Sequence, residues 1–255
     1  LSVEKLGFDS IWAAEAHDLD LLVKLTMAAV KTRNVKLGTV VLVPTLRYPA
    51  VLAKTLTSLD IVSNGRLILG AGCSDQPSLE RRGVPSDKPV SRMVESIRML
   101  KKLWTESSVT FRGQFYQIEN YSLPLKPIQK PHPPIWIAGG GPRMLRIIAT
   151  YADGWIGIPD PARYEALLSK IRYLMKDKGR DPAGLEPAVL AFTSIAPDHD
   201  KAEEYRKWDA PIVGNPDECI DHLERLVRSG ARHFILAFCA PNEKTYLSSL
   251  KLCAE

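Results

Sequence analysis

The sequence predicts an α/β fold built on a parallel sheet. Apolar, β-branched segments alternate with amphipathic helix patterns along nearly all of the 255 residues, which is typical of crossover units. The strand segments are almost continuously apolar, as parallel strands buried on both faces are. Seven such strands fit either an open doubly wound sheet or a closed (β/α)8 TIM barrel with one strand missing.

The individual elements follow from these periodicities and from their start signals. The strands are expected at 8–14, 35–43, 66–72, 134–139, 154–158, 188–196 and 233–238. The helices are expected at 19–32, 49–61, 91–105, 142–152, 161–177, 216–229 and 243–253. The helix from 216 has the clearest start, because Asn215 is a capping residue, Pro216 suits a first turn and Glu218 lies at capping-box spacing.

The opening residues, LSVEKLGFDSIW, are typical of a helix end, a glycine cap at Gly7 and then a strand. A strand is expected before that helix, so we expect the chain to begin inside its first βα unit. The stretch 197–215 is short for the helix that should follow strand 188–196. We therefore also expect that residues of the protein are missing from this sequence near 197–215 and near Ala16. One domain, 1–255, is predicted.

Two segments interrupt the βα rhythm. Residues 107–134 carry an alternating hairpin pattern around Arg112 and Gly113, followed by a proline-rich approach to strand 134–139. Residues 74–90 form a polar stretch after strand 66–72. We therefore expect non-repeat excursions at 74–90 and 107–131, where such folds often place substrate contacts.

Composition narrows the class of protein. The chain is 45% hydrophobic and 25% charged, with no apolar run of the roughly 20 residues that cross a membrane. The four cysteines are scattered and lack metal spacing, so we expect free thiols, no metal site and a cytoplasmic protein. A dispersed net charge of +5 argues against nucleic acid but suits a small anionic ligand.

The carboxyl ends of the strands are where such folds place function. The stretch Glu15 to Asp18 follows the first predicted strand, and Pro44 to Tyr48 follows the second. Cys73, Ser74 and Asp75 follow the third.

A glycine stretch, IWIAGGGPRML, ends strand 134–139. Gly139, Gly140 and Gly141 leave backbone N–H groups unobstructed, Pro142 presets a first helical turn, and Arg143 adds positive charge. Such a loop suits a phosphate at a helix N-terminus; the alternative is a turn that needs one positive φ. Neither GGGPRM nor GAGCSD has the third glycine of the dinucleotide fingerprint, which argues against a Rossmann dehydrogenase.

Together these motifs closely resemble the bacterial luciferase-like flavin and deazaflavin oxidoreductases. The resemblance runs from GFDSIWAAE through VKLGTVVLVPTLRYPAVLAKTLTSLDIVSNGRLILGAG and PPIWIAGGGPRML to IVGNPDECIDHLERLVRSGARHFIL. It implies a (β/α)8 barrel without its first strand, with insertions after strand four and before strand five. It also implies a non-prolyl cis peptide at Val40–Val41 behind the flavin ring, and a cofactor phosphate at Gly139 to Gly141.

The phrase PTLRYPAV followed by LGAGCSD is similar to the branch that uses coenzyme F420, an 8-hydroxy-5-deazaflavin. That branch includes methylenetetrahydromethanopterin reductases, so the resemblance implies hydride transfer between the deazaflavin and a small organic substrate. FMN-dependent monooxygenases share the barrel and the glycine loop and are the alternative, and a non-catalytic flavin-binding barrel is a third reading. Deazaflavin carries hydride and does not activate oxygen, so the first two predict different chemistry. The resemblance also implies a homodimer.

Three residues are catalytic candidates. Asp75 is expected as a general acid or base or as a substrate-orienting group, with an exposed loop acid as the alternative. Glu15 stands where the family has an acidic residue before a histidine. Here Ala16 follows, and His17 comes one place late, so His17 reaches the site only if the chain bulges locally; the alternative is a surface histidine.

The remaining candidates concern the cofactor. Gly72, Cys73 and Ser74 are expected to line the ring pocket together with Val40 and Val41. Thr39 is either a cofactor contact or an ordinary strand residue. Pro142 and Arg143 are expected to complete the phosphate site. For the basic residues Arg47, Arg81 and Arg82 we favour dispersed surface charge, and for the strand tryptophans, Trp155 included, a place in the core.

Overall fold

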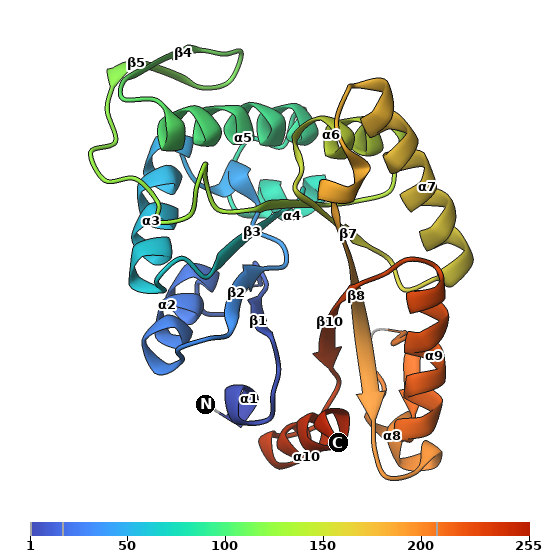
Figure 1. Cartoon of the computed structure of the whole chain (residues 1–255). Coiled ribbons are helices and arrows are strands. Elements are labelled where there is room, and N and C mark those ends of the chain that lie inside the picture. The colour runs from blue at the N-terminus through green and yellow to red at the C-terminus, as the bar shows by residue number, and fades with distance from the viewer. Residues whose placement is uncertain (1, 17, 208) are drawn as a thin grey trace. The chain divides into compact units, whose positions relative to one another are not determined.

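The computed structural model describes residues 2–16, 18–207 and 209–255. The chain forms two compact units, which are described separately. The N-terminal unit is Asp9–Ala138, and the C-terminal unit is Gly139–Glu255 together with the residues up to Phe8. Figure 1 labels the elements of both.

The N-terminal unit is a parallel sheet with helices between its strands. Its four parallel strands pair in the order β1 (Ser10–Ala13), β2 (Lys36–Thr39), β3 (Leu67–Ala71) and β6 (Ile135–Ala138). The connections hold α2 (Leu21–Lys31), η1 (Pro44–Leu46), α3 (Pro49–Val62), α4 (Gln76–Arg81) and α5 (Pro89–Thr105). Because consecutive strands are parallel and joined by helices, their carboxyl ends share one edge of this sheet.

The C-terminal unit repeats the same alternation. After α1 (Ser2–Lys5), its elements are α6 (Pro142–Tyr151), β7 (Gly154–Gly157), α7 (Pro161–Asp177), η2 (Pro182–Gly184), β8 (Glu186–Ile195), α8 (His199–Tyr205), β9 (Ile212–Gly214), α9 (Pro216–Arg228), β10 (His233–Phe238) and α10 (Glu243–Ala254). The long strand β8 pairs in parallel with β7, β9 and β10. Its residues Ala188, Val189 and Ala191 are buried although neighbouring side chains point to opposite faces, as expected of a strand covered on both faces.

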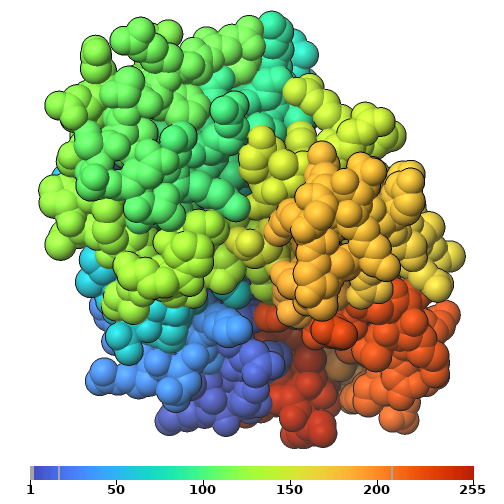
Figure 2. Space-filling model, turned by 45° about the horizontal axis from the view of Figure 1, so that its top comes forward, coloured from blue at the N-terminus to red at the C-terminus, as the bar shows by residue number. Residues whose placement is uncertain are grey.

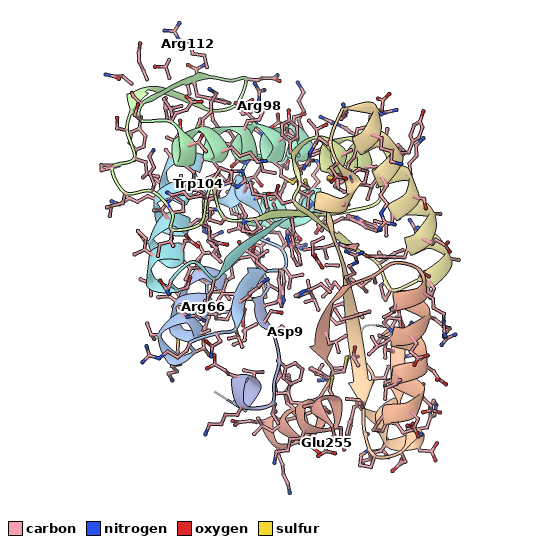
Figure 3. All side chains as sticks on the ribbon, in the orientation of Figure 1. Asp9, Arg66, Arg98, Trp104, Arg112 and Glu255 are labelled. Atoms are coloured by element: carbon pink, nitrogen blue, oxygen red, sulfur yellow. The ribbon has the colours of Figure 1, made fainter. Side chains whose placement is uncertain are left out.

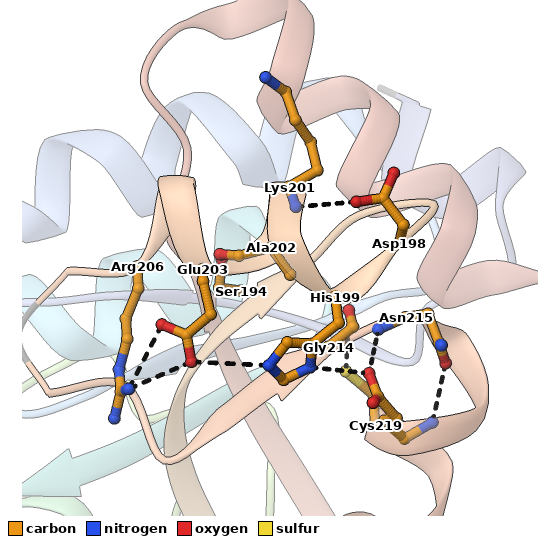
Figure 4. Close-up of polar contacts among 11 residues, drawn as sticks. Ser194, Asp198, His199, Lys201, Ala202, Glu203, Arg206, Gly214, Asn215 and Cys219 are labelled. Atoms are coloured by element: carbon orange, nitrogen blue, oxygen red, sulfur yellow. Dashed lines mark hydrogen bonds and ion pairs between the residues drawn. The ribbon is translucent and has the colours of Figure 1, made fainter.

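All seven predicted strands and seven predicted helices are present, with ends shifted by a few residues at most except in one strand. The expected strand 35–43 ends at Thr39, and beyond it only the bridge between Leu42 and Ala71 continues the pairing. The capping box of α9 is confirmed: Asn215 accepts from the amide of Glu218, and Glu218 accepts from the amide of Asn215 (Figure 4).

Besides the 3-10 helices η1 and η2, three short elements were not predicted. The stretch 197–215, read as short for the helix expected there, holds both α8 and β9, and the polar stretch 74–90 holds α4. These elements have seven, three and six residues. They are too short for an apolar period to register. The helix expected after strand 188–196 is thus present in shortened form, and the hypothesis of missing residues at 197–215 stays a prediction.

The predicted hairpin is confirmed as β4 (Val109–Arg112) and β5 (Gln117–Tyr121), in antiparallel pairing. One buried carboxylate from α5 fixes its turn: Glu95 accepts from the amides of Gln114, Phe115 and Tyr116 at 2.7 to 3.0 Å. Charge-assisted hydrogen bonds of this kind are the stronger ones in proteins. In the space-filling view, the segment from α5 through the hairpin makes a continuous part of the surface of its unit (green, Figure 2).

In each unit, an arginine closes the carboxyl end of a helix. Arg66, labelled in Figure 3, donates to the carbonyls of Ala29, Thr32 and Val35 at the end of α2. Arg180 donates to the carbonyls of Ala149 and Ala152 at the end of α6. The last carbonyls of a helix lack intrahelical partners, so a guanidinium both satisfies them and complements the dipole.

Candidate active site

The ends of β2 and β3 meet around a cis peptide bond at Val40–Val41, which confirms the bond expected from the motif. The amide of Val40 donates to the Ala13 carbonyl at 2.8 Å, and the amide of Leu42 donates to the Gly70 carbonyl at 2.8 Å. Gly72 has no room for a side chain, because a Cβ there would lie 2.6 Å from Cγ2 of Val41. Two predicted cofactor residues, Val41 and Gly72, are thus in direct contact.

Thr39 is fully buried at the end of β2, and its hydroxyl is committed to the next strand. It donates to the Gly70 carbonyl at 2.8 Å and accepts from the Gly70 amide at 2.9 Å. Both of its hydrogen-bonding roles are therefore used within the sheet. Of the two readings of Thr39, this geometry favours the strand residue.

Glu15, after β1, is held by a bidentate ion pair with Arg47. Nη1 and Nη2 of Arg47 lie 2.6 and 3.3 Å from the two carboxylate oxygens, and the Glu15 side chain is only 11% exposed. Nη2 also donates to Asp20, the N-cap of α2. Burial lowers the pKa of Arg47, but the hydrogen bonds that it donates to Glu15 and Asp20 raise this pKa overall.

The reading of Arg47 as dispersed surface charge was therefore wrong. Its side chain is 20% exposed and bridges two acidic residues from either side of the loop that follows β1. A guanidinium matches two carboxylates well because its donors form a rigid fork. The only sequence signal was that Arg47 follows a strand at the same edge of the sheet as Glu15. His17, in the same loop, lies outside the described residues.

Asp75 is exposed and begins α4. Its Oδ1 accepts from the Ser78 amide at 2.9 Å, as an N-cap does. Hydrogen bonding with the Ser78 side chain, and next with its amide, holds the pKa of Asp75 below its usual value. A carboxylate of this kind carries no proton at neutral pH, so the structure favours a proton-accepting or orienting role over that of an acid. The catalytic role itself stays a prediction.

Cys73 and Ser74 are half-buried between β3 and α4. The Cys73 thiol lies 3.7 Å from the sulfur of Met93 on α5. A thioether is no base, so this contact gives the thiol no means of activation, and it suits the expected lining role better than that of a nucleophile. Their contact with a cofactor ring stays a prediction.

The glycine loop belongs to the C-terminal unit, and its three glycines differ. Gly139 has φ +130°, which L-residues rarely adopt, and a Cβ there would lie 2.8 Å from Cγ of Met144. Gly141 has an ordinary φ of −73°, and a Cβ there would meet nothing within 4 Å. The fold therefore requires glycine at 139 and does not require it at 141.

Gly141 is the N-cap of α6, Pro142 opens the helix, and Arg143 follows in its first turn. No side chain caps α6. Six other helices begin at an Asp or Asn whose side chain accepts from a first-turn amide: α2, α4, α7, α8, α9 and α10. Gly139, Gly141, Pro142 and Arg143 are exposed, so the start of α6 presents bare backbone and a guanidinium to solvent.

The described residues contain no group of three or more His, Cys, Asp or Glu side chains placed to hold a metal ion. In the same part of the chain, no helix combines the length and the apolar character that a membrane span requires.

Comparison with known proteins places these features in a family. The model of the family described as luciferase-like monooxygenase matches residues 2–212. An F420-dependent glucose-6-phosphate dehydrogenase of Kineococcus radiotolerans is 32% identical over 231 residues, covering 83% of this chain and 67% of the relative. A phthiodiolone/phenolphthiodiolone dimycocerosates ketoreductase of Mycobacterium kansasii is 32% identical over 178 residues, covering 68% of this chain and 48% of the relative. The chain thus spans about half the length of that ketoreductase.

Among solved structures, the coenzyme F420-dependent tetrahydromethanopterin reductase of Methanopyrus kandleri matches with a TM-score of 0.85 and 22% identity, covering 99% of this chain and 91% of that one. This likeness confirms the predicted α/β fold class. The family match covers most of the sequence, including every candidate site residue. The chain therefore belongs to the luciferase-like monooxygenase family.

Proposed function

We propose that this protein is a coenzyme F420-dependent oxidoreductase that transfers a hydride between the deazaflavin and a small organic substrate. The observation that carries the proposal is the uncapped start of α6, where Gly141 leaves room that the fold itself does not need. Helix N-termini bind anions through free amides and the helix dipole. The residues that would hold the cofactor phosphate are Gly140, Gly141 and Arg143.

The N-terminal unit supplies groups that suit the substrate. Asp75 is ionised at neutral pH and is able to accept the proton that an alcohol loses on oxidation. Glu15 is fixed by Arg47, so it is able to orient a polar substrate without moving. When bound, the deazaflavin supplies a carrier for two electrons and a proton as hydride.

The choice of F420 over FMN is supported by the names of the relatives. The Kineococcus dehydrogenase and the Methanopyrus reductase are both named as F420-dependent. The substrates in these two names differ, a sugar phosphate in one and a tetrahydromethanopterin in the other, so a methylenetetrahydromethanopterin-type substrate is one candidate among several. The homodimer and the cytoplasmic location stay predictions.

The decisive experiment is titration of the purified protein with F420 and with FMN, followed by fluorescence. Bound oxidised F420 is then mixed with glucose 6-phosphate or a secondary alcohol, each of which is able to donate hydride. Bound reduced F420 is mixed with a ketone or methylenetetrahydromethanopterin, each of which is able to accept hydride. We expect F420 to bind and at least one substrate to bleach or restore its absorbance. Free F420 mixed with the same substrates is the control.

Two results would replace the proposal. Binding of FMN alone, with oxygen consumption, would make the protein a monooxygenase, a reading favoured by the description of the matched family. Tight binding of either cofactor without turnover on any substrate would favour a binding protein.

A further inference from the structure

We propose that Trp155 is the positioning residue of the glycine loop: its indole N–H holds the Gly139 carbonyl and thereby directs the Gly140 amide away from the core, toward an anionic ligand. The inference rests on the proposed function, in which this loop holds the cofactor phosphate. All of the groups concerned belong to the C-terminal unit.

The indole is immobilised by its neighbours. Trp155 lies in β7 and is fully buried. Its ring stacks on that of Tyr164 from α7, with 4.7 Å between centroids and 25° between planes. Tyr164 is also fully buried, and its hydroxyl donates to the Ala188 carbonyl of β8 at 3.4 Å. Two strands and a helix therefore fix the direction in which the indole N–H points.

That N–H reaches out of its own strand to the loop. Nε1 of Trp155 donates to the Gly139 carbonyl at 2.8 Å. A buried indole needs an acceptor, because an unpaired N–H in the core is costly. An aliphatic side chain at this position would pack in the core without needing an acceptor. Tryptophan adds a specific hydrogen bond to the carbonyl of Gly139.

The hydrogen bond from Trp155 to the Gly139 carbonyl sets the direction of the Gly140 amide. In a trans peptide the C=O and the following N–H point in opposite directions. Among the described residues the cis bonds are Val40–Val41 and Lys130–Pro131, so the Gly139–Gly140 bond is trans. With the carbonyl held on the buried indole, the Gly140 N–H points away from it. Gly139 itself has φ +130°, and an added Cβ would lie 2.8 Å from Cγ of Met144, so only glycine fits at the start of this peptide.

The test compares two tryptophans that make the same kind of bond. Trp155→Phe keeps an aromatic ring against Tyr164 but removes the donor and one ring of the buried indole, so its control must lose the same atoms. Trp104→Phe is the matched control, since buried Trp104 donates to the Ala53 carbonyl at 3.3 Å within the N-terminal unit (Figure 3). Dissociation constants are measured by fluorescence for coenzyme F420 and for the same deazaflavin with a plain ribityl chain, which has no phosphate.

The readout is the ratio of the two dissociation constants. We expect the wild type to prefer F420 and Trp104→Phe to keep that preference. Trp155→Phe should reduce it about tenfold, with binding of the phosphate-free deazaflavin unchanged. A wild type without preference would refute the phosphate site at this loop and with it the positioning role, whereas the proposed activity is decided separately by turnover of bound F420. A preference retained in Trp155→Phe would refute the positioning role alone. If Trp155→Phe does not fold, Tyr164→Leu decides, because it releases the indole but keeps its donor: the preference falls about threefold, or the positioning role is wrong.

Discussion

The end of β2 and β3 in the N-terminal unit and the glycine loop in the C-terminal unit are built on opposite principles. At the strand ends, charged side chains are present and already paired: Glu15 with Arg47, Asp20 with Arg47, and Asp75 with the α4 amides. At the glycine loop, side chains are absent and backbone is exposed. Paired side chains orient a reacting group, whereas bare amides bind an anion of fixed charge. We therefore expect changes in the first region to affect turnover and changes in the second to affect cofactor affinity.

The largest effect is expected from a carboxylate at the glycine loop. Gly141→Asp would cap α6 as Asp160 caps α7, using the amides that a phosphate needs and adding a like charge. We expect F420 affinity to fall about 100-fold, or ~2.7 kcal/mol, in a fluorescence titration. Gly141→Asn is the neutral control with the same shape and should lose less. Equal affinity of Gly141→Asp and wild type would show that the phosphate binds elsewhere.

The matching change at the strand ends is Arg47→Met. It leaves Glu15 and Asp20 without their shared partner, which we expect to cost about 2 kcal/mol of unfolding free energy in urea and to lower kcat about tenfold. Affinity for F420 should stay within about twofold of the wild-type value, because the proposed phosphate site lies at the glycine loop and not at the strand ends. Arg47→Lys keeps the positive charge but not the two-pronged guanidinium, so its stability and kcat should lie between those of Arg47→Met and the wild type. A loss of affinity as large as the loss of kcat would erase the distinction between the two regions.

A smaller effect separates the glycines of the loop. Gly139→Ala places a Cβ 2.8 Å from Met144 at φ +130°, so we expect a loss of about 1–2 kcal/mol of unfolding free energy. Gly141→Ala, at φ −73° with open space, should change stability by less than about 0.5 kcal/mol. Both are measured by urea unfolding without ligand. Equal losses at both positions would mean that the fold, and not a ligand, calls for the glycine at 141.

The smallest effect is expected from a charged cluster outside both regions. His199 on α8 lies 3.1 Å from Glu218 on α9, with Glu203 nearby (Figure 4). The hydrogen bond with Glu218 raises the pKa of His199 above its ordinary value of 6.5. The stability that the His199–Glu218 pair contributes is therefore complete below about pH 6.5. It disappears as the pH rises through the pKa of His199 in the folded state.

Thermal unfolding of His199→Gln and wild type from pH 5 to pH 9 measures this contribution. The wild type should be slightly more stable at the acid end, and the two curves should converge at the alkaline end. F420 affinity should be the same in both proteins. A stability difference that grows with pH would contradict the assignment of this cluster.

The sequence alone determined the order of strands and helices, because buried parallel strands and amphipathic helices each show a characteristic spacing of apolar residues. It located the glycine loop, the α9 capping box and the cis peptide at Val40–Val41 through motif and resemblance. Short elements such as α4, α8 and β9 escaped it, since a period needs more residues than they have.

Only the tertiary structure decided which side chains are paired. Trp155 was rightly read as core and Arg47 wrongly as surface charge, and the partner of neither was predicted. Arg47 lies 32 residues from its partner Glu15, and Trp155 lies 16 from Gly139. No local period encodes a contact between residues so far apart, because it depends on how neighbouring elements pack. The residues with reactive groups were visible in the sequence, and the residues that hold them in place became visible only in the fold.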